Sequence, residues 1–228
     1  MRTLVSSLAL LVVLALSAAA DDPPADKKAP PAKKEDTSDK KDKAPLTVGE
    51  NLPGPFHPYN VTGAHKEHFH CLISEHDLDP MVMIFHKNVD FSDPLPNLLK
   101  RLDAAIDKNP NTRLGAFVVF LPDDLPDVVG STEKDQDANS KNDDARLELA
   151  KKIEAFDSDN KLKHVVLCLD NKSDVKKYEL SDENLITIVL YTKLKVVAVH
   201  ALPKSEFTDA AIEKIMAEVA DKLGAKRK

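Results

Sequence analysis

The sequence is poor in aromatic residues and in cysteine. Its 228 residues include no tryptophan and two cysteines, and 5% of them are aromatic. A hydrophobic core must therefore be built mainly from leucine, valine and isoleucine. The formal net charge is −6, so the chain lacks the excess of basic residues with which proteins bind nucleic acid or anionic lipid. Neither partner is expected.

Long apolar stretches are also missing, with one exception at the N-terminus. Residues 1–20 contain Arg2, then a short apolar core, and end in three alanines. This is the pattern of a secretory signal with its cleavage site, and the apolar core is too short to span a bilayer comfortably. We therefore expect a secreted protein, or one of the periplasm or cell envelope, with no membrane attachment after cleavage.

Residues 21–45 lack large apolar side chains and consist almost wholly of Asp, Glu, Lys, Pro and Ala. Seven acidic and seven basic residues cancel each other in this segment. Because nothing could offset the entropy lost on ordering it, we expect a neutral, disordered linker. Residues 46–228 then remain as one domain, which is long enough to bury a substantial core.

The most informative stretch is residues 81–85, which are five apolar residues without a polar break. Such a run predicts a strand buried on both faces, at the centre of a sheet. A turn over residues 86–93 leads into a predicted helix, which Ser92 or Asp93 can cap and in which Pro94 suits the first turn. The apolar stripe of this helix is Leu95, Leu98, Leu99, Leu102 and Ile106.

The remaining pattern predicts an alternation of strands and helices. A second helix is expected around Leu149, Ile153 and Phe156, and a last one after a cap at Thr208, closed by Gly224. Residues 122–144 are acidic, polar and interrupted by proline and glycine, so an exposed loop is expected there. Further strands are expected at residues 69–74, 114–121, 164–169, 185–191 and 195–202, the last two as an antiparallel hairpin.

This order of elements resembles the thioredoxin fold, and in detail its redoxin branch, the alkyl hydroperoxide reductase and thiol-specific antioxidant family. The run VGENLP at residues 48–53, with Phe56, resembles that family's opening. NVTG at residues 60–63 is similar to its next turn, and residues 164–178 are similar to a later segment. The resemblance implies an α/β protein, a thioredoxin-like three-layer α/β/α sandwich with a mixed central sheet.

The sequence departs from that family at the position of its chemistry. The family carries its peroxidatic cysteine just past the central strand, in Pro-x-x-x-Thr/Ser-x-x-Cys, whereas residues 86–93 contain no cysteine. The proline that thioredoxins place before the penultimate strand is Ile186 here, although Thr187 after it is kept. We therefore expect a binding or structural module without the family's peroxidase activity. No cofactor is expected, and the sequence does not name a protein partner.

The two cysteines leave a second hypothesis open, a monothiol redox protein that uses Cys71 as its catalytic residue. Cys71 begins the run CLIS, which has the spacing of a redox Cys-x-x-Cys motif with serine in the second position. Cys168 lies in the apolar run VVLCL and is expected to be a small buried residue. The resemblance places the strand of Cys168 away from the lead-in, so no bridge between the two is expected. We expect Cys71 to be partly accessible and to react faster than Cys168.

Histidines support a third hypothesis, a metal-binding protein. Six of the eight histidines lie between His57 and His86. His65, His68, His70 and Cys71 could offer nitrogen and sulfur ligands to zinc or copper. If residues 69–74 form a strand, His68 and His70 share a face and Cys71 points away. The predicted metal ligands are therefore His65, His68 and His70.

Overall fold

The structure is a computed structural model that describes residues 46–123, 125 and 133–224, without the side chains of residues 133–140. The predicted signal (1–20) and linker (21–45) lie outside the described residues, and the boundary at residue 46 stays a prediction. Among the described helices, none is both long enough and apolar enough to cross a membrane.

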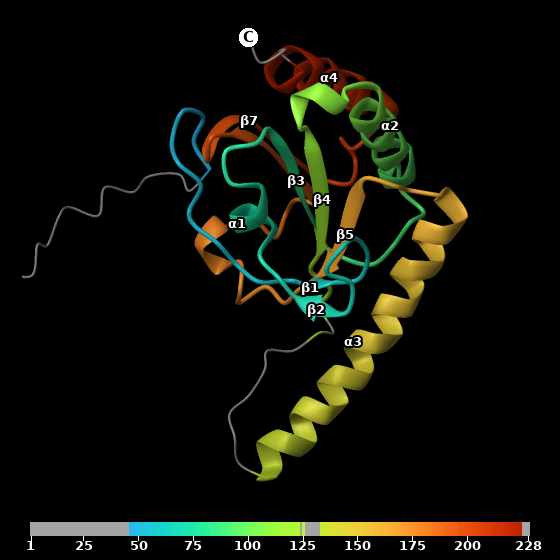
Figure 1. Ribbon diagram of the computed structural model, residues 1–228. Helices are drawn as coiled ribbons and strands as arrows, with labels where there is room; N and C mark the ends of the chain where they lie inside the picture. The colour runs from blue at the N-terminus through green and yellow to red at the C-terminus, as the bar shows by residue number, and fades with distance from the viewer. Residues whose placement is uncertain (1–45, 124, 126–132, 225–228) are drawn as a thin grey trace, which may run out of the picture. The chain divides into compact units, whose positions relative to one another are not determined.

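A mixed sheet of seven strands forms the centre of the domain (Figure 1). The strands lie in the order β2-β1-β5-β4-β3-β6-β7. Neighbouring pairs β3–β4 and β4–β5 are parallel, and the other pairs are antiparallel. The strand bounds are β1 (Tyr59–Asn60), β2 (His68–Phe69), β3 (Met81–His86), β4 (Gly115–Phe120), β5 (Val165–Leu169), β6 (Ile186–Thr192) and β7 (Lys195–Leu202).

The predicted central strand and the helix after it are confirmed. All six residues of β3 are buried, and successive side chains point to opposite faces, so Ile84 packs into one core cluster and Phe85 into the other. Helix α2 (Leu95–Lys108) follows, and Asp93 Oδ1 accepts a hydrogen bond of 2.9 Å from the backbone N–H of Leu95. The predicted hairpin is also confirmed, because β6 pairs with β7.

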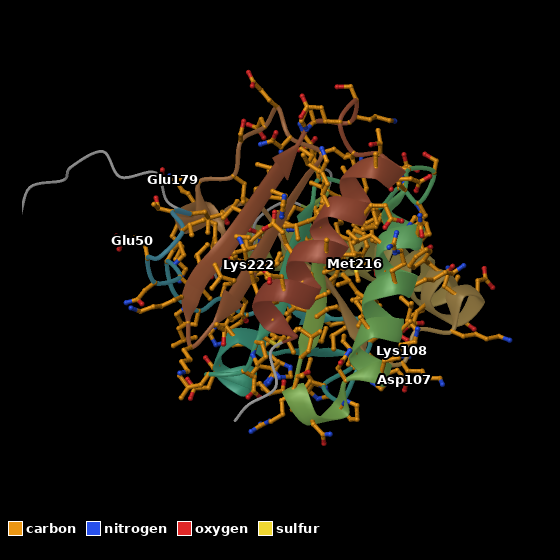
Figure 2. The ribbon with its side chains drawn as sticks, turned by 90° about the horizontal axis from the view of Figure 1, so that it is seen from above. Glu50, Asp107, Lys108, Glu179, Met216 and Lys222 are labelled. Carbon is orange, nitrogen blue, oxygen red and sulfur yellow. The ribbon has the colours of Figure 1, made fainter. Side chains whose placement is uncertain are left out.

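Three helices cover one face of the sheet, namely α2, α3 (Glu133–Asn160) and α4 (Asp209–Glu218). Figure 2 shows α2 and α4 side by side, where the Arg101 guanidinium donates two hydrogen bonds of 2.6 and 2.8 Å to the Glu213 carboxylate. Thr208 caps α4 as predicted, and the π-helical turn η3 (Val219–Leu223) continues it to Gly224.

The opposite face is covered by the lead-in from residue 46, by helix α1 (Leu72–His76) and by the loop that contains the short 3-10 helix η2 (Lys176–Tyr178). Another short 3-10 helix, η1 (Pro110–Thr112), precedes β4. The sheet is therefore enclosed between two covering layers. This confirms the three-layer α/β/α sandwich with a mixed central sheet.

The predicted strand at residues 69–74 is wrong, because β2 ends at Phe69 and helix α1 begins at Leu72. Cys71 is the N-cap of this helix, and its Sγ accepts hydrogen bonds from the backbone N–H of Ser74 at 3.4 Å and from the Ser74 hydroxyl at 3.2 Å. The apolar pair Leu72 and Ile73 is buried on one side of the helix, and as adjacent residues they fit a helical turn as well as a strand.

The predicted loop at residues 122–144 is wrong from Glu133 onward, because α3 already begins there. Residues 126–132 lie outside the described residues. Glutamate, lysine, glutamine and alanine favour helix, and this propensity outweighs the missing apolar stripe. Figure 1 shows the first half of α3 running past β1 and β2. Its second half buries Leu149, Ile153 and Phe156 against the sheet, which confirms the predicted second helix.

Candidate functional site

The turn after β3 is closed by a buried histidine and aspartate. His86 is fully buried, and its Nδ1 donates a hydrogen bond of 2.7 Å to the carbonyl oxygen of Asn88. Its Nε2 lies 2.8 Å from Asp93 Oδ2. Because the other oxygen of Asp93 accepts from Leu95, both polar atoms of His86 and both oxygens of Asp93 are used. The position that the redoxin resemblance assigns to a cysteine is thus filled by a self-contained hydrogen-bonded turn.

Sequence reasoning missed the pair of His86 and Asp93, although a signal for it was present. In a strand, residues two apart share a face, so His86 continues the face of Val82 and Ile84. A polar side chain on a buried face requires hydrogen-bond partners, and the following turn offers two carboxylates, Asp90 and Asp93, that it could bring back.

A cleft of about 320 Å³ lies beside this turn. His86 and Thr187 both line it, and so do residues of the loop between β5 and β6. Thr187 is the threonine that this chain shares with thioredoxins at the start of the penultimate strand. Buried apolar side chains line the cleft together with lysines closer to solvent: Phe85, Leu121 and Val175, and Lys87, Lys172 and Lys176. Neither cysteine is among the residues that line it.

A pair of carboxyl groups shapes the loop that borders the cleft. Burial, together with the neighbouring Asp174 carboxyl group, raises the pKa of Asp170 to about 8. A carboxylic acid that keeps its proton can donate to the neighbouring carboxylate, which two ionised groups cannot do. The Asn171 side chain ties the same loop, because its Oδ1 accepts from the Ser173 hydroxyl at 2.7 Å and the Asp174 backbone N–H at 3.1 Å.

Both cysteines are free and buried. Burial raises the pKa of the Cys168 thiol well above its usual value, and Sγ donates a hydrogen bond of 3.2 Å to Asn60 Oδ1. Asn60 of β1 lies opposite Cys168 of β5, so the expectation that this strand lies away from the lead-in is wrong. The expectation failed because β1, which belongs to the lead-in, pairs with β5 and extends the sheet beyond it. No bridge forms between the cysteines, as expected.

The expectation that Cys71 is partly accessible is wrong. Its exposed fraction is 4%, because the residue begins α1 and packs into the core cluster beneath that helix. Its sulfur faces Ser74, which donates both hydrogen bonds that the thiol accepts. No second thiol lies at the end of the Cys-x-x-Ser run to resolve a mixed disulfide.

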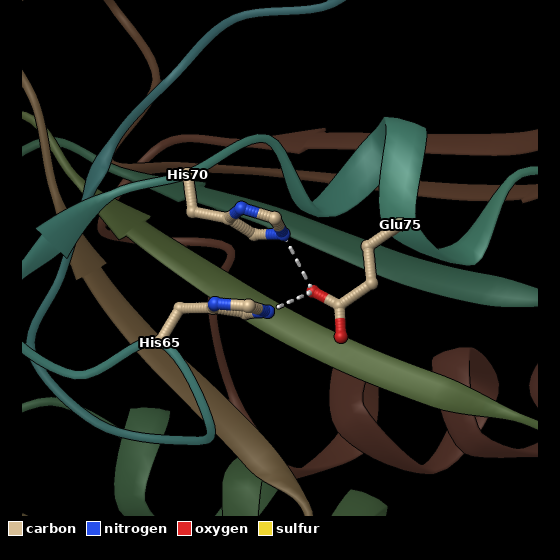
Figure 3. Close-up of side chains that lie close together, drawn as sticks. All are labelled: His65, His70 and Glu75. Carbon is tan, nitrogen blue, oxygen red and sulfur yellow. Dashed lines mark hydrogen bonds and ion pairs between the residues drawn. The ribbon is translucent and has the colours of Figure 1, made fainter.

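The structure brings two of the three predicted metal ligands together and replaces the third. The rings of His65 and His70 stack with centroids 3.6 Å apart, and both direct Nε2 to the Glu75 carboxylate (Figure 3). Oε2 of Glu75 lies 2.9 Å from Nε2 of His70 and 3.6 Å from Nε2 of His65. His68 is exposed, and its Nδ1 lies 2.8 Å from the carbonyl oxygen of Lys66 instead. Glu75 was missed because only the helical form of α1 turns it toward His70.

No protein-family model matches the sequence, and no curated protein matches it. Solved structures do. A protein of Chlorobium tepidum described as the thiol:disulfide interchange protein DsbE is 15% identical with a TM-score of 0.51, over 78% of this chain and 99% of that one. Peroxidoxin BcpB of Mycobacterium tuberculosis is 11% identical with a TM-score of 0.51, over 78% and 98%. A yeast mitochondrial 1-Cys peroxiredoxin is 11% identical with a TM-score of 0.50, over 78% and 79%.

At these identities the likeness concerns the fold. The similar structures are thioredoxin-fold redoxins and thiol-disulfide oxidoreductases, which is the group that the resemblance of the sequence indicated. The absence of the family's cysteine after β3 agrees with the hydrogen-bonded turn found there. The chain therefore has a thioredoxin-like fold.

Proposed function

We propose that this protein is an exported, thioredoxin-like binding module that takes a small, mainly apolar ligand in the cleft beside His86 and Thr187. The observation that carries the proposal is the open cleft of about 320 Å³ next to a turn without a thiol. A pocket of this size, lined by apolar side chains with a few polar groups, is typical of small-ligand sites. Export rests on the signal pattern of residues 1–20.

The buried turn argues against thiol catalysis at this position. A catalytic cysteine needs a thiolate that substrate can reach, and in this chain the turn presents the pair of His86 and Asp93 instead. Cys71 precedes β3 and is enclosed beneath α1, and Cys168 lies inside β5. The proposed protein thus keeps the scaffold of the redoxins and lacks their peroxidase activity.

Three lysines line the cleft against two acidic residues, Glu179 and Asp182, and this small excess of positive charge favours a ligand with an anionic end. Lys176 is exposed at the border of the cleft. Lys172 pairs with Asp182 at 3.1 Å, and Lys87 donates to the backbone carbonyl of Asp182 at 2.7 Å. The buried side chains of Phe85 and Val175 would contact the apolar body of the ligand. A compound with a ring system and one acid group combines both features.

The test uses anilinonaphthalene sulfonate, a fluorescent dye with an apolar body and one sulfonate. We expect saturable binding of one dye per chain. Leu180→Glu places a carboxylate at the cleft and should weaken dye binding at least about tenfold, because it puts a charge where the apolar body lies and repels the sulfonate. Leu147→Glu is the matched control, since Leu147 is exposed on α3 and does not line the cleft.

Equal dye binding by both variants and by the unchanged protein would contradict the proposed site. Thermal unfolding of each variant shows whether the domain still folds. The catalytic part is tested separately, by peroxide consumption with dithiothreitol. We expect a rate no higher than that of free thiol, whereas a much faster rate that Cys71→Ser abolishes would show a peroxidase.

A further inference from the structure

A second feature lies away from the cleft, in the segment that joins β1 to α1. His65 comes from the loop between β1 and β2, His70 follows β2, and Glu75 lies in α1. Their ligand atoms all lie within 4.8 Å of one another. Within the described residues, this is the group of histidine, cysteine and carboxylate side chains that converges closely enough to hold a metal ion.

Backbone hydrogen bonds fix this segment independently of any ion. The backbone N–H of Glu67 donates to the carbonyl of Asn60 at 2.7 Å, with Glu67 at φ 65°, and this turns the loop back on itself. The N–H of His68 donates to the carbonyl of His65 at 3.1 Å. On the other side, the N–H of Glu75 donates to the carbonyl of Cys71 at 3.1 Å. The three ligand residues are thus held by a formed loop and a capped helix, so little ordering is required to bind an ion.

The distances between the ligand atoms suit a tetrahedral ion. Zinc binds histidine nitrogen and carboxylate oxygen at about 2.0–2.2 Å, which in tetrahedral geometry separates neighbouring ligand atoms by roughly 3.3 Å. The two measured separations between Nε2 and Glu75 Oε2, 2.9 and 3.6 Å, lie on either side of this value. Two imidazoles and one carboxylate are also a ligand set that zinc uses with a fourth position left for water.

The site is open enough for an ion to enter. The exposed fractions of the side chains are 42% for His65, 32% for His70 and 34% for Glu75. A cavity of about 130 Å³ is lined by His65 and Glu75, and also by His76 and His164. It offers space for a water molecule or another small ligand in the fourth position.

We propose that His65 Nε2, His70 Nε2 and the Glu75 carboxylate bind a zinc ion that links the β1–β2 loop to α1. His68 takes no part, although the sequence pattern alone predicted it as a ligand. Cys71 takes no part either, because its sulfur is turned to Ser74 under the helix.

The experiment measures zinc affinity of the full chain without a polyhistidine tag, by competition with a chromophoric chelator. We expect one zinc ion per chain. His65→Ala, His70→Ala and Glu75→Gln should each weaken binding at least about tenfold, since even the loss of a group that only orients a ligand costs 10–100-fold. His68→Ala is the matched control, a histidine of the same segment, and should bind zinc as the unchanged protein does.

Two other outcomes of this experiment would overturn the proposal. If His68→Ala weakens binding as much as His70→Ala, the ligands are those that the sequence alone predicted. If none of the variants changes the affinity, zinc binds elsewhere on the chain. Thermal unfolding without metal shows whether Glu75→Gln still folds, and zinc should raise the melting temperature of the His68→Ala variant but not that of Glu75→Gln.

Cobalt provides a second measurement. Co²⁺ in the same site should give the visible absorption bands of a four-coordinate nitrogen and oxygen environment, without the near-ultraviolet band of a cobalt–thiolate bond. A thiolate band that Cys71→Ser removes would place the sulfur in the site and contradict the proposed ligand set.

Discussion

Buried polar residues lie at the ends of β3 and β5, namely His86, Asp170 and Asn171, and the Asp93 side chain beside His86 is 4% exposed. They lie where parallel strands end, the edge at which α/β proteins commonly carry their chemistry. His86 and Asp93 satisfy each other, whereas Asp170 meets a second carboxyl group that favours its protonated form. The polar groups at this edge therefore stabilise the turns around the cleft, and among them only His86 also lines it.

The raised pKa of Asp170 predicts a pH-dependent stability. In the folded chain this acid keeps its proton up to about pH 8, whereas in the unfolded chain it ionises near its usual pKa of 3.8. The folded state thus binds more protons over this range, and the free energy of unfolding should fall as pH rises from about 4 to about 8. Asp170→Asn removes this contribution, since the amide can donate to Asp174 at any pH.

Urea unfolding between about pH 5 and about pH 8 tests this, because it measures the free energy of unfolding directly. The fall in stability should be smaller in Asp170→Asn than in the unchanged protein. Parallel pH profiles for the two proteins would mean that Asp170 ionises normally in the folded state.

Helix α3 shows how different the two halves of one element can be. Its first half runs past the edge of the sheet (Figure 1). Farther along the helix, exposed charged side chains pair with each other, such as Glu148 with Lys151 at 2.7 Å. Its second half packs Ile153 and Phe156 into the core. The first half is not free of the domain, because Asn142 and Arg146 are also buried. Substitutions on the buried and exposed sides of the helix should therefore differ in effect.

We expect Ile153→Ala to lower the free energy of unfolding by about 2–5 kcal/mol, because Ile153 is fully buried and its loss leaves a cavity. Leu147→Ala, six residues earlier on the exposed side of the helix, should change it by no more than about 0.5 kcal/mol, because Leu147 is 47% exposed. Urea unfolding of both variants measures the difference. Comparable losses would mean that the side of the helix that carries Leu147 is also packed.

At the scale of the whole molecule, both thiols are enclosed by the layers around the sheet. Cys168 lies in β5 with no exposed surface, and Cys71 lies beneath the lead-in layer. A reagent can reach such groups only when the domain opens, locally or as a whole. Thiol reactivity therefore reports on the stability of the domain.

We expect iodoacetamide to modify neither thiol appreciably in the native protein, and both in urea, with mass spectrometry as the measurement. Cys71 should react before Cys168, because it caps a helix of five residues that can open without disrupting the sheet. Rapid labelling of native Cys71 would favour the monothiol redox hypothesis instead.

Much of the fold follows from the sequence because it depends on local patterns. The apolar run of β3 has no polar residue that could face water, and Thr208 has the side chain and spacing of a helix cap. The hairpin of β6 and β7 likewise follows from two apolar runs with a tight turn between them. For these elements the alternatives would expose apolar surface, so the pattern alone was sufficient.

The candidate sites depended on the tertiary structure. Helix α1 could not be distinguished from a strand in a run as short as residues 69–74, and that choice decides whether Glu75 or His68 lies beside His70. The pairing of β1 with β5 is equally non-local, since Asn60 and Cys168 meet across more than half the domain sequence. The sequence determined which segments must be buried, because burial follows from side-chain chemistry. Only the packed chain decided which polar groups meet, because that depends on how distant segments are placed in space.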